Sequence, residues 1–329
     1  MSEETFATSQ PSTEPQDAPK TVVDVRHLTK RFGKFTAVDD LDLTVREGEI
    51  FGFLGSNGAG KTTAIRVMCG LLKPTSGSTE VLGFDVSKEP EEIKKRIGYM
   101  SQRFSLYEEL TVRQNLLFFG GVYGLRGEML RERMAWAVDM TDLEGMQDRR
   151  TLSLPGGWKQ RLALACAVLH SPPIVFLDEP TSGVDPISRR QFWTLIDQMA
   201  SEGTTVFVTT HYLDEAEHCD RLALMHAGKL MADGSVNDLK SVFDNRAVLE
   251  VGCRDIVGAL ELLGRQDWVL ETSVFGTRLH VVVRNEAEGS RATTELLEEN
   301  DNAATSIIPV PPSLEDVFIH HVETAEAAA

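Results

Sequence analysis

The fold of this chain is decided by the stretch Glu49-Ile-Phe-Gly-Phe-Leu-Gly-Ser-Asn-Gly-Ala-Gly-Lys-Thr62. Its apolar first half has the character of a buried strand, and its second half matches the phosphate-binding pattern G-x-x-x-x-G-K-[ST]. Glycines let backbone N–H groups turn towards phosphate oxygens, and the N-terminus of a following helix adds partial positive charge. We therefore expect nucleotide phosphates to contact Gly55, Ser56, Asn57, Gly58, Ala59, Gly60, Lys61, Thr62 and Thr63. Lys61 would neutralise the β- and γ-phosphates, and the Thr62 hydroxyl would ligate Mg²⁺.

A second apolar strand, Ile174–Leu177, ends in the two carboxylates of Asp178 and Glu179. Adjacent side chains of a strand point to opposite sides, so the two acids can serve different purposes. We expect Asp178 to hold Mg²⁺ and Glu179 to orient the water that attacks the γ-phosphate. A positioned base of this kind contributes about 10²–10⁴-fold to a rate. The two stretches together predict hydrolysis of a nucleoside triphosphate with Mg²⁺.

The order of the remaining segments predicts an α/β core with parallel strands. Short alternating stretches between Val22 and Val45 predict antiparallel strands, residues 62–72 predict a helix, and Thr204–Val208 predicts a third core strand. Residues from about 104 to 150 have helix-compatible, charge-laced sequence. After residue 240 the pattern restarts as strand, helix, two strands, helix and strand. We expect a nucleotide-binding domain over 21–240 and a small α+β domain with a flexible end over 241–329.

Composition and charge narrow the possible functions. The chain has 329 residues and a net charge of −17, which argues against nucleic acid as a partner, because phosphate backbones require a basic surface. Residues 241–329 hold 16 acidic and 6 basic residues, which supports a boundary near residue 240. Residues 1–20 are polar and acidic without an apolar signal core, and we expect them to form a disordered tail. No apolar run reaches the length of a membrane span.

Four cysteines lie far apart and form no CxxC pair, which predicts buried thiols in a reducing compartment. His218, Cys219 and His226 do not have the spacing of a common zinc site. The sequence therefore predicts a cytosolic protein without a structural metal, whose role at a membrane would depend on a partner.

The phosphate loop, the acid pair and the sequence between them resemble the nucleotide-binding domains of ATP-binding-cassette (ABC) transporters over about residues 22–240. That resemblance implies a P-loop NTPase fold, with a RecA-like core, an antiparallel β-subdomain and a helical subdomain at about 104–150. The family's signature L-S-G-G-Q corresponds to Leu154-Pro-Gly-Gly-Trp158. In the family this segment contacts the γ-phosphate bound by the opposite subunit, so the resemblance assigns that contact to Pro155, Gly156 and Gly157. Pro155 offers no hydroxyl in place of the family's serine, and Ser153 could supply one if the loop shifts.

Four other positions are assigned by the resemblance. Gln102 matches the glutamine that senses Mg²⁺ and water, and His211 matches the switch histidine that reaches the γ-phosphate. Asp185 matches the loop that crosses the dimer interface. Phe32 matches the aromatic residue that stacks on adenine, which is usually tyrosine. With Glu179, the resemblance assigns catalysis to Gln102 and His211, and metal binding to Thr62, Gln102 and Asp178.

The segment Pro312-Ser-Leu-Glu-Asp-Val-Phe318 resembles the chain ending of ATPases that serve ABC-2-type exporters. This implies a multi-spanning permease as partner, a second ATPase subunit such as another copy of this chain, and a position on the inner face of the cell membrane. Two alternatives remain at this point: a soluble ABC ATPase that acts on ribosomes or DNA, and a weakly hydrolysing regulatory subunit. Two observations count against the first alternative. The chain has a single phosphate loop, whereas translation-type members carry two cassettes, and the 94 positions between Lys61 and Pro155 leave no room for the coiled coil of DNA-repair members.

Overall fold

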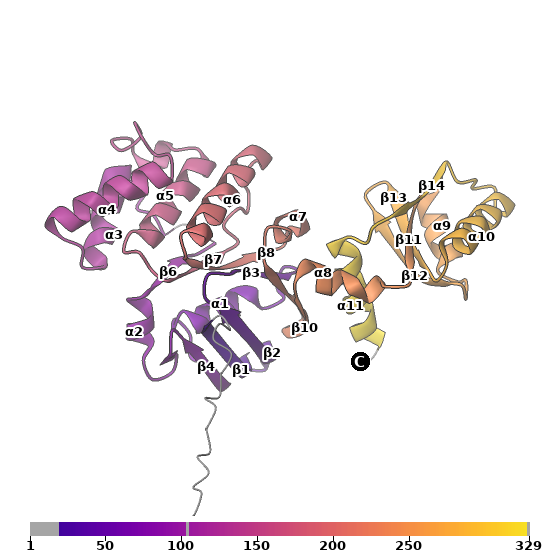
Figure 1. The fold of residues 1–329 in the computed structure, drawn as a ribbon, viewed down its shortest axis with the longest axis horizontal. Coiled ribbons are helices and arrows are strands. Elements are labelled where there is room, and N and C mark those ends of the chain that lie inside the picture. The colour runs from indigo at the N-terminus through magenta and orange to yellow at the C-terminus, as the bar shows by residue number, and fades with distance from the viewer. Residues whose placement is uncertain (1–19, 103–104, 328–329) are drawn as a thin grey trace, which may run out of the picture.

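The computed structural model describes residues 20–102 and 105–327, so the tail expected over 1–20 lies outside the described residues except for Lys20. Phe104, where the helical region was expected to begin, also lies outside them. Figure 1 shows the arrangement of the elements. Those up to residue 240 are β1 (Thr21–Phe32), β2 (Phe35–Arg46), β3 (Ile50–Gly55), α1 (Lys61–Met68), β4 (Ser76–Val81), β5 (Phe84–Asp85), α2 (Pro90–Lys94), β6 (Ile97–Met100), α3 (Val112–Val122), α4 (Gly127–Met140), η1 (Thr151–Ser153), α5 (Gly156–Val168), β7 (Ile174–Asp178), α6 (Pro186–Ser201), β8 (Thr205–Thr210), α7 (Leu213–Ala216), β9 (Arg221–His226), β10 (Lys229–Gly234) and α8 (Val236–Lys240).

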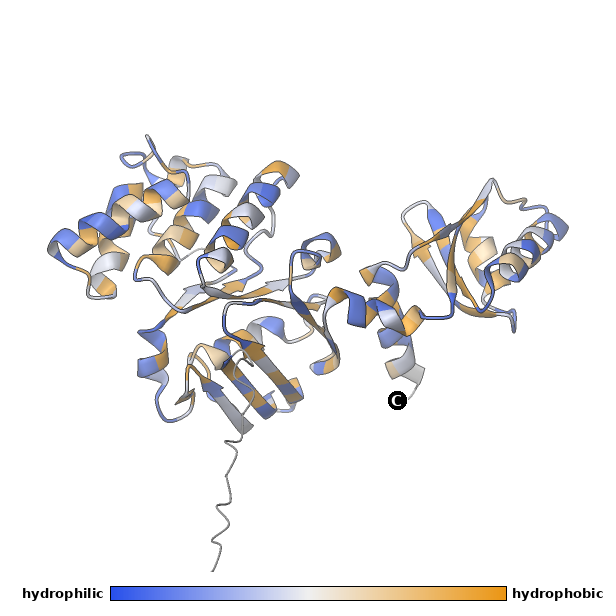
Figure 2. Cartoon of the chain, in the orientation of Figure 1, coloured by the Kyte–Doolittle hydropathy of each residue, from blue (hydrophilic) through white to orange (hydrophobic). Residues whose placement is uncertain are grey.

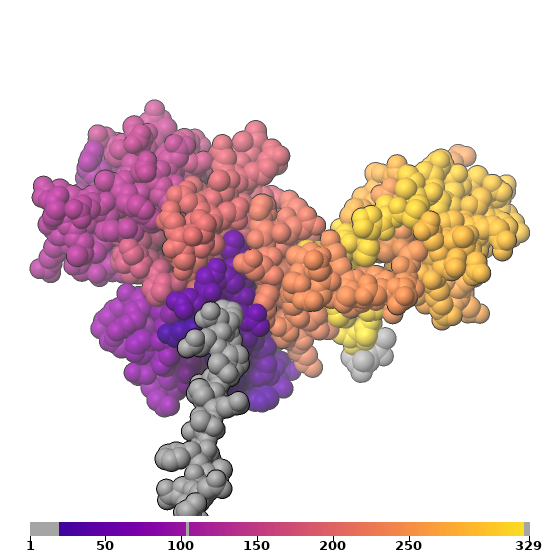
Figure 3. Space-filling model, in the orientation of Figure 1, coloured from indigo at the N-terminus to yellow at the C-terminus, as the bar shows by residue number. Residues whose placement is uncertain are grey.

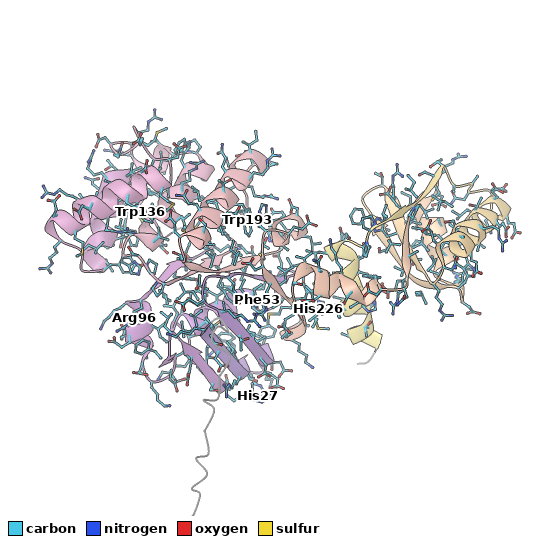
Figure 4. The ribbon with its side chains drawn as sticks, in the orientation of Figure 1. His27, Phe53, Arg96, Trp136, Trp193 and His226 are labelled. Atoms are coloured by element: carbon cyan, nitrogen blue, oxygen red, sulfur yellow. The ribbon has the colours of Figure 1, made fainter. Side chains whose placement is uncertain are left out.

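A six-stranded sheet in the order β10-β9-β3-β8-β7-β6 forms the centre of the molecule. All its strands are parallel except β10, which pairs antiparallel with β9. Alternate residues of β3 serve two cores: Ile50 and Leu54 pack in the core that contains Trp193, and Phe51 and Phe53 pack in another. Figure 4 shows Phe53 and Trp193 on opposite sides of the sheet. The parallel strands place their carboxyl ends at one edge, where open α/β sheets bind ligands.

A second, antiparallel sheet in the order β2-β1-β4-β5 covers one face of this centre. Strands β1 and β2 pair antiparallel, which confirms the prediction for Val22–Val45. In β2, Leu41, Leu43 and Val45 are buried and alternate with exposed polar residues, and Figure 2 shows this alternation along the strands of the sheet. The sheet thereby covers the core around Phe51 and Phe53 with one face and meets water with the other.

Helices α3, α4 and α5 pack against one another on the other side of the central sheet (Figure 1). The helices α3 and α4 fall within the stretch 104–150 that was expected to be helical. The helix predicted over 62–72 is shorter than expected, because α1 ends at Met68. Gly70 adopts a φ of +67°, and the N–H groups of Leu71 and Leu72 both donate to the Arg66 carbonyl, which closes the helix.

After residue 240 the chain builds a third sheet in the order β12-β13-β11-β14, in which all neighbours are antiparallel. Each predicted strand and helix is present, and their order, βαββαβ, together with this strand order is the ferredoxin-like arrangement. The sequence did not predict that topology. The elements are η2 (Ser241–Phe243), β11 (Ala247–Gly252), α9 (Ile256–Leu263), β12 (Val269–Phe275), β13 (Arg278–Val283), α10 (Glu286–Glu299), β14 (Ser306–Val310) and α11 (Leu314–Ala327).

The last helix, α11, returns towards the first part of the chain. It contacts α8 and β10 as well as β12, and its residues Leu314 and Val317 are buried in the core that also holds Leu224 and Leu239. In the space-filling view the ferredoxin-like part forms a separate lobe joined through this narrow region (Figure 3). Within the described residues, no helix has the length and apolar character needed to cross a membrane.

Candidate active site

The phosphate loop connects β3 to α1 at the carboxyl edge of the central sheet. Gly58 and Gly60 have φ angles of +83° and +109°, which side-chain-bearing residues rarely adopt. A Cβ on Gly60 would lie 2.3 Å from the Ala37 carbonyl oxygen, so β2 leaves room for glycine alone. Helix α1 has no side-chain cap, and its first N–H groups are therefore available to an anion. The loop has the backbone that a nucleotide phosphate requires.

Lys61 is folded back over this loop. Its Nζ donates to the carbonyl oxygens of Gly55 at 2.7 Å and Ser56 at 3.2 Å, and it lies 3.3 Å from Glu179 Oε1. The side chain is only 4% exposed, and this burial lowers the pKa of Lys61, although the Glu179 carboxylate opposes the shift. A buried ammonium group therefore lies beside the loop, where it can meet a polyanion.

Asp178 fits the metal-binding assignment. Its Oδ1 accepts hydrogen bonds from the Thr62 hydroxyl at 2.9 Å and from the Thr209 hydroxyl at 3.1 Å. Its Oδ2 is buried and has no hydrogen-bond partner among the described residues. Burial raises the pKa of Asp178, while the two hydroxyls act in the opposite direction. A buried carboxylate oxygen without a partner, next to a threonine hydroxyl, is a donor set that suits a hard cation such as Mg²⁺.

Glu179 diverges from Asp178 for a reason that the sequence did not reveal. We expected strand alternation to separate the two carboxylates, but β7 ends at Asp178 and Glu179 has a left-handed backbone with φ of +48°. Its N–H donates to the Thr209 hydroxyl at 2.9 Å, which holds this conformation. The turn sends the Glu179 side chain towards the phosphate loop.

Three side chains from separate segments surround the Glu179 carboxylate. Gln102 Nε2 donates to Oε2 at 2.9 Å, His211 Nδ1 lies 3.4 Å from the same oxygen, and Lys61 lies beside Oε1. His211 Nδ1 and Oε2 are close but not aligned as a hydrogen bond. Glu179 is 7% exposed, so these three side chains make up much of the surroundings of its carboxylate. The predicted catalytic residues Gln102, Glu179 and His211 therefore meet at one point.

A cavity of about 390 Å³ lies in front of the loop. Among the described residues its lining includes one aromatic side chain, Phe35, and does not include Phe32, to which the resemblance assigns adenine. Phe32 is 48% exposed and pairs with Phe35 across the tight turn between β1 and β2. The sequence offered one signal for Phe35, because both aromatics flank the two-residue turn Gly33-Lys34. The cavity is lined by Phe35, Ala37, Asn57, Gly58, Ala59, Gly60, Lys61, Thr62, Thr63, Gln102 and Glu179.

The predicted signature residues Pro155, Gly156 and Gly157 line a different cavity, of about 210 Å³, together with Asp185. No residue of the phosphate loop lines it. Pro155 is the N-cap of α5 and makes no side-chain cap, whereas Asp185 caps α6 by accepting from the N–H groups of Ile187 and Ser188. Within one chain the signature and the phosphate loop therefore belong to separate sites.

Ser153 does not replace the missing hydroxyl in this conformation. Its Oγ donates to the Arg150 carbonyl at 2.8 Å within the 3₁₀ turn η1. The Trp158 and Lys159 N–H groups donate to the Pro155 carbonyl. The N–H groups at the start of α5 that can contact a phosphate are therefore those of Gly156 and Gly157.

The chain is similar to known proteins. A family model described as ABC transporter matches residues 38–182. The probable multidrug ABC transporter ATP-binding protein YbhF of Escherichia coli K12 is 53% identical over 222 residues, which cover 68% of this chain and 38% of YbhF. The chain thus spans about two fifths of that relative's length. The daunorubicin resistance ATP-binding protein DrrA2 of Streptomyces coeruleorubidus is 35% identical over 308 residues, which cover 91% of this chain and 96% of DrrA2.

Solved structures agree. The dimeric structure of a post-hydrolysis state of the ATP-binding cassette MJ0796, bound to ADP and phosphate, is 27% identical and has a TM-score of 0.59, covering 65% of this chain and 98% of that one. The structure of an ATP-binding subunit of an ABC transporter has a TM-score of 0.62 at 28% identity, with 68% and 94% covered. Nothing among these relatives favours a ribosome- or DNA-directed ATPase. The chain belongs to the ATP-binding proteins of the ABC transporter family.

Proposed function

We propose that this chain powers a membrane exporter of the ABC-2 type by closing and reopening as a dimer with each round of ATP hydrolysis. The observation that carries the proposal is the meeting of Lys61, Gln102 and His211 at the Glu179 carboxylate. Each of these three side chains is expected to contact the γ-phosphate, Mg²⁺ or the attacking water. The Glu179 carboxylate is therefore suited to orient water only when the γ-phosphate is bound.

The chain's own residues would act in order. Lys61, now paired with Glu179, would move onto the β- and γ-phosphates and free the carboxylate. Glu179 would then accept a hydrogen bond from the attacking water, which Gln102 and His211 help to orient. Thr62 and Asp178 would hold Mg²⁺, which when bound offsets phosphate charge. A charged γ-phosphate favours the closed dimer because only that state adds the partner's signature segment to it.

The exporter assignment rests on the relatives and on the chain's end. The Nod factor export ATP-binding protein I of a Rhizobium species is 34% identical to this chain. Both it and DrrA2 align over 91% of this chain, so their alignments extend into the region after residue 240. The segment Pro312–Phe318 leads into α11, which begins at Leu314 and joins the C-terminal lobe to α8 and β10. We infer that this lobe is a separate domain from about residue 241, and that the permease places the chain at the inner face of the cell membrane.

The partner in the dimer would be a second copy of this chain. Its Pro155, Gly156, Gly157 and Asp185 would complete the nucleotide site, since these residues lie apart from the phosphate loop within one chain. Phe35 and Phe32 would hold adenine between the tips of β1 and β2.

The test is affinity purification of the Glu179→Gln protein with Mg-ATP from detergent-solubilised membranes of its source. We expect slow hydrolysis, a closed dimer and co-purification of one multi-spanning protein, whereas the Lys61→Ala protein should bring down less of it. Recovery of ribosomal or DNA-bound proteins without a membrane protein would overturn the proposal. Undiminished turnover by Glu179→Gln would overturn the catalytic assignment.

A further inference from the structure

Glu215, on the short helix α7, is a buried carboxylate outside the residues assigned so far. It is 2% exposed, and both of its oxygens are occupied. Oε1 accepts from the Thr181 hydroxyl at 2.5 Å, and Oε2 accepts from the Thr210 hydroxyl at 2.6 Å. Arg189 Nε lies 3.3 Å from Oε1 as a counter-charge. Burial of an ionised carboxylate is tolerated only with donors of this kind, so the four groups constrain one another.

Each partner of Glu215 belongs to a segment of the candidate active site. Thr181 follows Glu179 by two residues, and Thr210 immediately precedes His211. Arg189 lies in the first turn of α6, the helix that Asp185 caps and that lines the signature cavity. One carboxylate therefore ties together the loop after the acid pair, the end of β8 and the helix that would face the partner subunit.

Aromatic contacts run alongside these hydrogen bonds. The Arg189 guanidinium carbon lies 3.8 Å from the centre of the Tyr212 ring, and the Tyr212 and His211 rings have centroids 4.1 Å apart. The Tyr212 N–H donates to the same Thr210 hydroxyl that binds Glu215. Arg189 thus reaches His211 by two routes, one through Tyr212 and one through Glu215 and Thr210. A shift of α6 would displace His211 unless both routes gave way.

We propose that Glu215 is a positioning residue for ATP hydrolysis, which fixes His211 and the segment after Glu179 relative to helix α6. The partner subunit's approach to α6 then sets the arrangement around the Glu179 carboxylate. This inference rests on the proposed assignment of Glu179 and His211 to catalysis. Glu215 itself lines neither the phosphate-loop cavity nor the signature cavity, so it acts through other residues and does not touch the nucleotide.

The first experiment compares steady-state ATP hydrolysis by the full-length Glu215→Gln and Glu217→Gln proteins. Glutamine keeps the shape of Glu215 but removes its charge. It also replaces one carboxylate oxygen, which accepts from a threonine hydroxyl, with an NH₂ group that can only donate. We expect kcat to fall about 10- to 100-fold, as for misplaced catalytic groups, while KM for ATP and affinity for ADP change less than about threefold. Glu217 is 63% exposed and pairs only loosely with Lys240, so its variant should keep wild-type turnover.

A second pair of variants covers the case in which Glu215→Gln does not fold. Thr210→Val removes the hydroxyl at nearly constant shape, and Thr210→Ser restores it. We expect Thr210→Val to lose turnover with little change in KM and Thr210→Ser to recover at least half of it. A purely structural role would instead change thermal stability and KM in Glu215→Gln and Thr210→Val.

His211→Ala separates this inference from the proposed function. Loss of turnover in His211→Ala, with wild-type kcat in Glu215→Gln and Thr210→Val, would overturn the role of Glu215 and leave the active site assignment standing. Wild-type turnover in His211→Ala would overturn the assignment itself, and with it the reason for the positioning.

Discussion

At the scale of residues, the site gives two neighbouring carboxylates different partners. Asp178 and Glu179 are adjacent, yet one is held by two threonine hydroxyls and the other by Lys61 and Gln102. The left-handed backbone at Glu179 is what separates them. A residue other than glycine is strained in this conformation and adopts it only because its surroundings hold it there. Strained residues of this kind cluster at functional sites.

Removal of the Lys61 ammonium should weaken binding of ATP. A hydrogen bond to a charged group contributes about 1.5–3 kcal/mol, which corresponds to about 10- to 100-fold in affinity. We expect the Lys61→Ala protein to show this loss in a titration with a fluorescent ATP analogue. Lys229→Ala serves as the control, because Lys229 is 66% exposed and lies 3.8 Å from Asp39, away from the cavity. Affinity within twofold of wild type would count against the phosphate-binding role of Lys61.

The raised pKa of Asp178 makes stability depend on pH in a definite direction. A carboxyl group whose pKa is higher in the folded than in the unfolded state contributes stability at low pH, and this contribution is lost as pH rises through the folded-state pKa. The nucleotide- and metal-free protein should therefore gain stability relative to Asp178→Asn when pH falls from 7 to about 4, the usual pKa of a free aspartate. Urea unfolding of both proteins at the two pH values measures the difference. A pH-independent difference would contradict the burial of an ionisable group here.

At the scale of elements, helix α5 begins with a residue that cannot cap it. Serine at an N-cap accepts a backbone N–H bond and is preferred there, whereas Pro155 provides neither an acceptor side chain nor a hydroxyl for phosphate. In the Glu179→Gln background, we expect Pro155→Ser to tighten the ATP-bound dimer by about 10-fold, equivalent to one added hydrogen bond to a charged group. Sedimentation at several protein concentrations would measure this. An unchanged dimer constant would show that the backbone of α5 already supplies the whole contact.

Helix α11 joins the two parts of the chain through buried apolar contacts. Leu314 is 2% exposed in the core it shares with α8 and the central sheet. Leu314→Ala should destabilise the protein by about 2–5 kcal/mol, as for other buried leucines. Ile308→Ala, at a position 48% exposed on β14, should cost less than about 1 kcal/mol. Equal effects in thermal unfolding would mean that α11 is not docked in solution.

The sequence predicted the elements well and their ends and partners less well. Periodicity identified β3, β7 and β8, because buried parallel strands leave short apolar runs between helices. It placed the end of α1 too late, because a glycine turn within an apolar stretch leaves no break in the pattern. It could not give the strand order of the C-terminal sheet, since that order depends on contacts between distant segments.

The same limit applies to the site. Motifs located Lys61, Asp178 and Glu179, but the contact between Glu179 and Gln102 joins residues 77 positions apart and needed the fold. Glu215 was missed altogether, because a single acid near His211 resembles any helix-starting acid in the sequence. Its partners become apparent only when β8 and α6 are placed together.

At the scale of the whole molecule, the negative charge is concentrated at one end. Residues 241–329 hold 16 of the 50 acidic residues and 6 of the 33 basic ones, and much of this stretch forms the C-terminal lobe. Two such lobes in a dimer would repel each other, so they favour positions on opposite outer sides of the assembly. In that arrangement the lobes would lie away from the proposed interface between the phosphate loops and the signatures.

The separation of the two cavities in one chain has a genetic consequence. Each chain would bring half of one catalytic centre and half of another, so two different defects can compensate for each other. Gly156→Asp adds a carboxylate where the structure has open space, beside the γ-phosphate that the partner is proposed to bind, and Lys61→Ala disables the other half. Each variant alone should be inactive, but an equal mixture should recover activity, because mixed dimers contain one intact centre. Absence of complementation in the co-refolded mixture would show that both centres must be intact together or that the halves never meet.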